Sequence, residues 1–345
     1  MNGTPAMDGT NRTDRPILAV SDLVVEFRGK RGQVVVANDH LSLDIQPGET
    51  LGIVGESGSG KSVFCRAVLR LLPSPPAQVR AKSLLFDGRD LMRLSEREMR
   101  GVRGQDIAMI FQNPMSSLNP VWPIGDQVAE PLRLHKGMAR NEARAAAIEL
   151  LRRVGIPSPE KRVDDYPYQW SGGMMQRAVI AMALAGAPKL MLADEPTTAL
   201  DVTIQDQILS LLLELQRESG MSLVLVSHDM GVIAETCDRV VVMYAGRIVE
   251  LASTPEIFDR AAHPYTQALL RSIPRLDNRT SRLSSIPGQP PDLAQLGIGC
   301  SFAERCPMAT ADCRSQAVDL RPVGTGHLSA CLYPDRVAAL APVAS

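Results

Sequence analysis

The chain has 345 residues, of which 37 are Lys or Arg and 38 are Asp or Glu, so its formal net charge is −1. This length can bury a full hydrophobic core and is typical of about two domains. The even charge balance gives no polyelectrolyte signature, so we expect no nucleic-acid partner. The longest apolar stretch, residues 178–193, is interrupted by Gly186, Pro188 and Lys189 and is too broken to cross a bilayer. We therefore expect a soluble or peripheral protein.

The first residues, 1–16, are polar and lack the apolar segment of a secretory signal, so we expect a disordered N-terminal arm. Alternating apolar residues then predict strands over residues 17–27 and 33–45, with a glycine-containing turn at residues 29–32.

A glycine-rich loop follows a short apolar strand expected at residues 50–54. The loop follows the pattern G-x-x-x-x-G-K-S and consists of Gly55, Glu56, Ser57, Gly58, Ser59, Gly60, Lys61 and Ser62. The glycines let backbone N–H groups turn inward, and a helix that opens at Lys61 presents unpaired N–H groups to an anion. Lys61 would contact the β and γ phosphates of a nucleotide, and the Ser62 hydroxyl would bind Mg²⁺. The sequence predicts an ATP site here rather than a plain strand-to-helix turn.

Two adjacent carboxylates end another apolar strand, at residues 190–195. Asp194 would hold Mg²⁺ directly or through water, as carboxylates beside phosphate loops do. Glu195 would face the γ-phosphate, where a carboxylate can orient and polarise the attacking water. Without the upstream loop, both could be solvated loop acids.

A third motif precedes the apolar segment at residues 178–187, and it consists of Ser171, Gly172, Gly173, Met174 and, further on, Gln176. An N-capping serine at a helix N-terminus again favours an anion. The motif resembles the signature of ATP-binding cassette (ABC) proteins. The resemblance implies an α/β P-loop domain with a mixed β core, a helical subdomain and an antiparallel β subdomain. It also implies that this motif contacts the γ-phosphate held by a second cassette. Met174 replaces the usual glutamine, and Trp170 replaces the usual leucine.

Other residues match family landmarks in order. Gln112 resembles the glutamine that touches Mg²⁺ and reports the nucleotide state to the membrane partner. Asp201, in the loop at residues 199–201, resembles the residue that crosses the cassette interface. His228 resembles the switch histidine that contacts the γ-phosphate. Phe27 is a candidate for stacking on adenine, although an aromatic residue in an alternating strand is more often a core residue.

The domain organisation follows from these motifs. We expect the cassette at residues 17–252, with a helical subdomain at about residues 113–172, and an extension at residues 253–345. Residues 140–154 have apolar side chains at helical spacing. In the family, this subdomain and residues 114–119 form a groove for a permease helix, but such an apolar surface could equally be core.

The extension has its own composition. His263-Pro264-Tyr265-Thr266 opens a short helical segment, and residues 287–291 are rich in proline. Together with the cassette, this extension resembles the ATPase subunits of bacterial dipeptide and oligopeptide importers. The resemblance covers about residues 17–334.

Four cysteines cluster in the extension: Cys300, Cys306, Cys313 and Cys331. In a reducing cytosol such a cluster suggests a metal site rather than disulfides. The spacings are wider than the C-x-x-C pairs of zinc ribbons, and all-thiolate ligation with a following proline suits a [4Fe–4S] cluster. Importer ATPases that resemble this chain carry such a cluster in this region, and zinc is the alternative. We expect a structural role, because a small extension cannot build its own core.

The resemblance implies an ATP-hydrolysing subunit of a peptide importer at the cytoplasmic face of the cell membrane. Its expected partners are a paralogous ATPase, two transmembrane permeases and an external solute-binding protein. Three alternatives stay open: an importer ATPase for another solute such as nickel or a sugar, a soluble cassette ATPase of translation or repair, and an iron–sulfur sensor that uses ATP as a regulator.

Overall fold

The computed structural model describes residues 15–29, 32–198, 200–273 and 286–338. Most of the expected disordered arm and Ala199 of the expected interface loop lie outside these ranges. Within them, no helix combines the length and the apolar character needed to cross a membrane.

The strands of the described residues are β1 Leu18–Arg28, β2 Val34–Ile45, β3 Thr50–Val54, β4 Ala77–Arg80, β5 Ser83–Phe86, β6 Arg89–Asp90, β7 Ile107–Ile110, β8 Leu190–Asp194, β9 Ser222–Ser227, β10 Arg239–Tyr244, β11 Arg247–Ser253, β12 Arg321–Gly324 and β13 His327–Ser329. The helices are α1 Lys61–Val68, α2 Glu96–Val102, α3 Pro114–Ser117, α4 Ile124–Lys136, α5 Arg140–Arg153, α6 Pro159–Arg162, α7 Gly172–Leu184, α8 Val202–Ser219, α9 Met230–Thr236, α10 Thr254–Arg260, α11 Pro264–Arg271, α12 Ala311–Ser315 and α13 Pro334–Ala338, with 3-10 turns η3 Leu91–Arg93 and η4 Pro167–Gln169.

The central sheet has the strand order β12-β13-β11-β10-β3-β9-β8-β7. The pairs β10–β3, β3–β9, β9–β8 and β8–β7 are parallel, whereas β10–β11, β11–β13 and β13–β12 are antiparallel. Because parallel strands end at the same edge of a sheet, the segments that follow β3, β7, β8 and β9 meet there. These segments carry the sequence motifs of the predicted ATP site.

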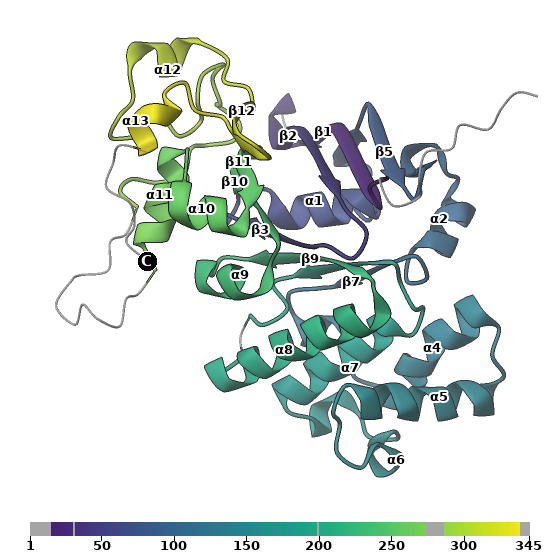
Figure 1. Cartoon of the computed structure of the whole chain (residues 1–345). Coiled ribbons are helices and arrows are strands. Elements are labelled where there is room, and N and C mark those ends of the chain that lie inside the picture. Colours follow the sequence, from purple (N-terminus) through teal and green to yellow (C-terminus); the bar gives the residue numbers. More distant parts are fainter. Residues whose placement is uncertain (1–14, 30–31, 199, 274–285, 339–345) are drawn as a thin grey trace, which may run out of the picture.

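The parallel strands are apolar on both faces because both faces are covered. In β9, Leu223 and Leu225 join a core that includes residues of α7 and α8, whereas Val224 and Val226 join a second core with residues of α1 and β1. Figure 1 shows this sandwich, with α1 on one side of β3 and β9 and with α7 and α8 on the other.

A smaller antiparallel sheet, β2-β1-β5-β6 with β4 also paired to β1, covers the outer side of the α1 core. Its first two strands begin and end within a residue of the ranges predicted from the sequence. Helices α4 and α5 lie within residues 113–172, where the sequence predicts helices, and both pack against α7. Helix α5 closely matches the helix expected at residues 140–154.

The extension continues the central sheet, since β13 pairs with β11 of the cassette through Leu328 and Ser329. The carboxylate of Glu250 on β11 is fully buried and accepts hydrogen bonds from the N–H groups of Ala262, at 2.6 Å, and His263, at 3.0 Å. It also lies 2.7 Å from Nε2 of His327 on β13. Figure 1 shows the extension beside the β10–β11 edge of the sheet.

Candidate ATP site

The predicted phosphate loop connects β3 to α1, and its path requires glycine at both ends. At Gly55, where φ is +152°, a Cβ atom would lie 2.2 Å from the carbonyl oxygen of Met243. At Gly60, where φ is +100°, it would lie 2.4 Å from the carbonyl oxygen of Ala37. Any side chain would therefore push the loop off the strand end, which explains the spacing of the glycines.

Helix α1 begins with an open N-terminus. Its N-cap is Gly60, so no side chain caps the first N–H groups, and the first turn has no acidic residue. Free N–H groups and the positive end of the helix dipole favour an anion at this point. Buried Asn38 fixes the turn, because its Nδ2 donates hydrogen bonds to the carbonyl oxygens of Gly60, at 3.0 Å, and Ala37, at 2.9 Å.

The Lys61 ammonium group is folded into the loop. Its Nζ donates to the carbonyl oxygens of Gly55, at 2.7 Å, and Glu56, at 3.0 Å, and the residue is 5% exposed. Burial lowers the pKa of Lys61, while the nearby carboxylates of Glu195 and Asp194 oppose this shift. The Lys61 amine thus lies beside the open helix end, where a phosphate would sit.

Ser62 and Asp194 meet across the site, since the Ser62 hydroxyl donates to Oδ1 of Asp194 at 2.8 Å. Asp194 is 1% exposed, and its other carboxylate oxygen, Oδ2, is buried without a hydrogen-bond partner. Burial raises the pKa of Asp194, and the Ser62 hydrogen bond opposes that shift. An unpaired buried oxygen next to a hydroxyl is a donor set that fits Mg²⁺.

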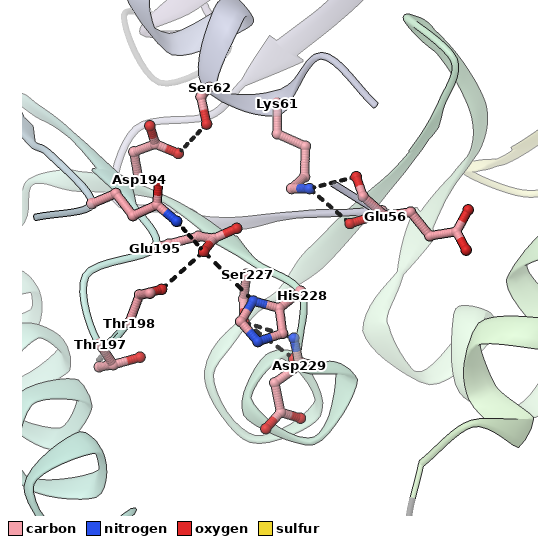
Figure 2. Close-up of polar contacts among 12 residues, drawn as sticks. Glu56, Lys61, Ser62, Asp194, Glu195, Thr197, Thr198, Ser227, His228 and Asp229 are labelled. Carbon is pink, nitrogen blue, oxygen red and sulfur yellow. Dashed lines mark hydrogen bonds and ion pairs between the residues drawn. The ribbon is translucent and has the colours of Figure 1, made fainter. Parts of the chain in front are cut away.

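Glu195 is the centre of a polar cluster, shown in Figure 2. Its Oε2 accepts hydrogen bonds from Nε2 of Gln112, at 2.9 Å, and from the hydroxyl of Thr198, at 2.8 Å. Nδ1 of His228 lies 3.6 Å from the same oxygen. The backbone of Glu195 has φ +48°, a conformation that is uncommon outside glycine and that clusters at functional sites. The structure therefore brings together all three residues that the sequence assigned to catalysis.

The signature residues open α7. Ser171 is exposed and N-caps the helix by accepting from the N–H of Met174 at 3.3 Å. Gly172 is also exposed, and Gly173 and Met174 are half-buried. Gln176 differs, because it is 1% exposed and its side-chain amide has no hydrogen-bond partner.

Asp201 and Phe27 are the two remaining residues that the sequence assigned to the site. Asp201 is exposed and N-caps α8 by accepting from the N–H of Ile204 at 3.0 Å. Phe27 is half-buried on β1, opposite Val35 and Ala77, and it packs against the α1 core.

The four extension cysteines line one small cavity together with Phe302 and His263. Burial raises the pKa values of Cys300, Cys306 and Cys331, that of Cys331 to about 11. Within residues 15–29, 32–198, 200–273 and 286–338, no three His, Cys, Asp or Glu side chains are arranged to hold a single metal ion.

Several residues of the site were not identified from the sequence. Thr198 binds Glu195, and Asn38 holds the phosphate loop, but each is an ordinary polar residue with no motif around it. Tyr265 and Arg305 of the extension contact Glu56 from segments 209 and 249 residues away in the chain. Only the position of Tyr265 in the His-Pro-Tyr segment could have drawn attention to it.

Comparison with known proteins agrees with this geometry. Residues 38–198 match the ABC transporter family, and residues 249–313 match the family described as "Oligopeptide/dipeptide transporter, C-terminal region".

Two curated relatives illustrate the similarity. The "Dipeptide transport ATP-binding protein" of Escherichia coli is 48% identical over 318 residues, which are 92% of this chain and 97% of the relative. Its counterpart in Bacillus subtilis is 50% identical over 297 residues, or 86% of this chain and 88% of that one.

Among solved structures, a dimeric ATP-binding cassette in a post-hydrolysis state, bound to ADP and Pi, is 28% identical. It covers 69% of this chain and 98% of its own, with a TM-score of 0.61. These matches confirm the predicted α/β cassette fold and the ATPase class. The chain belongs to the ATP-binding subunits of ABC transporters and has the C-terminal region of the oligopeptide/dipeptide type.

Proposed function

We propose that this chain couples ATP hydrolysis to the import of dipeptides or oligopeptides at the cytoplasmic face of the cell membrane. The observation that carries the proposal is that one chain combines a phosphate loop facing Asp194 and Glu195 with a C-terminal region that matches the oligopeptide/dipeptide type. The relatives named for dipeptide transport align over nearly the whole chain, which supports the peptide as the transported molecule.

In the proposed reaction, the ATP phosphates bind the N–H groups of the loop from Gly55 to Ser62, with Lys61 on the β and γ phosphates. Lys61 exchanges its bonds to loop carbonyl oxygens for phosphate oxygens. The Glu195 carboxylate takes a proton from a water molecule as that water attacks the γ-phosphorus, and the bond to ADP breaks. Gln112 orients Glu195, and His228, exposed beside it, reaches the γ-phosphate.

Ser62, Asp194 and Gln112 are the residues that would hold Mg²⁺. The unpaired Oδ2 of Asp194 supports this assignment. When bound, the ion would neutralise charge on the phosphate oxygens.

A second cassette would complete the site. The γ-phosphate held by the partner would contact the signature residues Ser171, Gly172, Gly173 and Met174. The N-terminus of α7, where Ser171 is the N-cap and both Ser171 and Gly172 are exposed, supports this use. Gln176, the last residue assigned to the signature, lies on the buried side of α7. Asp201 would cross the interface, and we propose a paralogous ATPase as the partner. Phe27 is the proposed adenine-stacking residue.

The proposed docking site for the permease is a groove of about 600 Å³ beside Gln112. Its walls come from α3, α4 and α7, and its lining includes Phe111, Ser116 and Met182. Gln112 both borders the groove and donates a hydrogen bond to Glu195. A permease helix bound in the groove would therefore be coupled to the Glu195 carboxylate through this one side chain. Two permeases and a solute-binding protein complete the proposed importer.

For the extension, we propose a [4Fe–4S] cluster held by Cys300, Cys306, Cys313 and Cys331, with zinc as the alternative. Support comes from the four thiols around one cavity and from their all-cysteine chemistry. The thiols would have to turn toward a common centre on binding. Iron and acid-labile sulfide in stoichiometric amounts in anaerobically purified protein would support the cluster, whereas stoichiometric zinc would select the alternative.

Affinity purification from gently solubilised membranes of the native host tests the assignment as a whole. We expect two multispanning permeases, a second cassette ATPase and a peptide-binding protein. If a binding protein for nickel or a sugar is recovered instead, the transported molecule is that solute and not a peptide. Recovery of ribosomal, repair or redox proteins alone would refute the transport role and leave the ATPase chemistry.

A further inference from the structure

The extension holds one residue of the phosphate loop directly. The Arg305 guanidinium forms a bidentate ion pair with Glu56, in which Nη1 donates to Oε2 at 2.6 Å and Nη2 donates to Oε1 at 3.0 Å. Glu56 is the second residue of the phosphate loop, and Arg305 immediately precedes Cys306. The contact thus joins two segments 249 residues apart in the chain.

Arg305 is held rigidly in place. Its side chain is 4% exposed, and its remaining donors are satisfied by the carbonyl oxygens of Pro287, at 2.9 Å, and Ile286, at 3.2 Å, and by the hydroxyl of Tyr244, at 3.2 Å. Its Cζ also lies 5.9 Å from the ring centre of Phe302. A buried guanidinium with every face occupied is an anchor of fixed geometry, since moving it would leave a charge unpaired in the interior.

The same loop residue is held a second time. The backbone N–H of Glu56 donates to the hydroxyl of Tyr265 at 2.8 Å, and Tyr265 is fully buried against Tyr244 and Phe302. The carbonyl oxygen of Glu56 accepts from Lys61. Consequently Tyr265 fixes the backbone N–H of Glu56 and Arg305 fixes its carboxylate, while its carbonyl oxygen accepts from Lys61 and from the N–H of Ser59.

This arrangement has an electrostatic consequence. A free carboxylate in a phosphate loop would repel the polyphosphate, and a mobile loop would lose conformational entropy when the nucleotide orders it. The Arg305 pair neutralises the carboxylate and orders the loop before ATP arrives, so both costs are reduced.

We propose that Arg305 is a positioning residue for the phosphate loop, through which the extension sets the affinity of the cassette for ATP. This proposal rests on the proposed ATP site. The competing explanation is that Arg305 only ties down the extension, in which case its loss would lower the stability of the protein without a specific change in ATP binding.

The test is equilibrium titration of the full-length chain with Mg-ATP, together with hydrogen exchange of the loop amides. Arg305→Lys keeps the charge and loses the bidentate pair. It should raise the Kd about tenfold, as loss of one charge-assisted pair implies, and should speed exchange at residues 55–60 without ATP. Arg144→Lys is the control, because it breaks another bidentate pair, with Asp164 at 2.8 and 2.7 Å, at the exposed surface of the helical region. It should leave the Kd unchanged.

A double-mutant cycle with Glu56→Gln separates positioning from stability. Once Glu56 carries no charge, Arg305→Lys should have little further effect on the Kd. The proposal is overturned if Arg305→Lys leaves the Kd and loop exchange unchanged, if Arg144→Lys changes the Kd equally, or if the effects of Glu56→Gln and Arg305→Lys simply add. Unimpaired ATP binding by Lys61→Ala would instead refute the ATP site itself.

Discussion

Gln112 and Glu195 lie on neighbouring strand ends, and a hydrogen bond of 2.9 Å joins the side-chain amide of the first to the carboxylate of the second. Gln112 also lines the groove between the sheet and the helical region. A displacement in the groove therefore has a direct physical route to the carboxylate, with one side chain between them.

Replacing Gln112 should weaken hydrolysis more than binding. In Gln112→Ala, the Glu195 carboxylate loses a donor that orients it, and the proposed Mg²⁺ site loses one of its three side chains. We therefore expect kcat to fall about tenfold and the Kd for Mg-ATP to rise by a smaller factor. Steady-state ATPase assays and ATP titration check this. Ser116→Ala, which changes the same groove without touching Glu195, is the control; equal kcat in both variants would contradict the expectation.

Glu195→Gln should separate ATP binding from hydrolysis. The amide cannot take a proton from water, and general-base catalysis typically contributes about 10²- to 10⁴-fold, so turnover should drop by that order while ATP still binds. Single-turnover hydrolysis and ATP-dependent dimer formation measure the two effects. Glu214→Gln on the exposed side of α8 should behave like the native chain. Near-normal turnover of Glu195→Gln would remove Glu195 from its proposed role.

Asp194→Asn should weaken Mg²⁺ binding without loss of the fold. The ionised carboxylate is buried, so the neutral amide of similar shape removes a desolvation cost, and the Tm of the nucleotide-free protein should not fall. The Mg²⁺ concentration needed for half-maximal ATP binding should rise about tenfold or more. Magnesium titration and calorimetry measure the two quantities. An unchanged magnesium requirement would show that the ion binds elsewhere.

Two glycines of the loop should differ in what they tolerate. A Cβ at Gly60 would lie 2.4 Å from a carbonyl oxygen and 2.6 Å from Nδ2 of Asn38, so Gly60→Ala should abolish ATP binding. Gly58 also has a positive φ, +81°, but a Cβ atom there would have no neighbouring atom within 4 Å, so Gly58→Ala should cost only backbone strain, about 1 kcal/mol. Thermal unfolding and ATP titration of both variants separate collision from strain. Equal losses of ATP affinity in the two variants would show that the positive φ, and not the steric collision, limits substitution at both glycines.

The cassette cysteines should be unreactive in the native protein. Burial raises the pKa of Cys237 to about 12, and Cys65 is fully buried with its pKa raised in the same direction. Since the thiolate is the nucleophile, alkylation of Cys237 should be slow at pH 8 and should speed up about tenfold per pH unit below its pKa. Mass spectrometry of alkylated peptides measures the rates. The same reaction in concentrated urea is the control, and equal rates in both conditions would contradict the burial of these thiols.

Much of the fold and the proposed site could be predicted from sequence because the motifs combine local chemistry with chain order. The phosphate loop needs glycine for steric reasons, and parallel strands deliver Asp194 and His228 to one edge of the sheet. What sequence could not supply was pairing between distant segments. Neither the Arg305–Glu56 ion pair nor the β11–β13 pairing has a periodic or spacing signal, since each depends on how the extension folds back. The domain boundary expected after residue 252 stays a prediction.

The β11–β13 pairing makes the extension a poor candidate for trimming or exchange between paralogues. A chain cut after β11 would present an unpaired, apolar edge strand, a surface that invites strand addition and aggregation. It would also strip the buried Glu250 carboxylate of its donors from Ala262, His263 and His327. Chimeras of such subunits should therefore not be joined at the end of the cassette, because strand β11 of the cassette and strand β13 of the extension pair in one sheet.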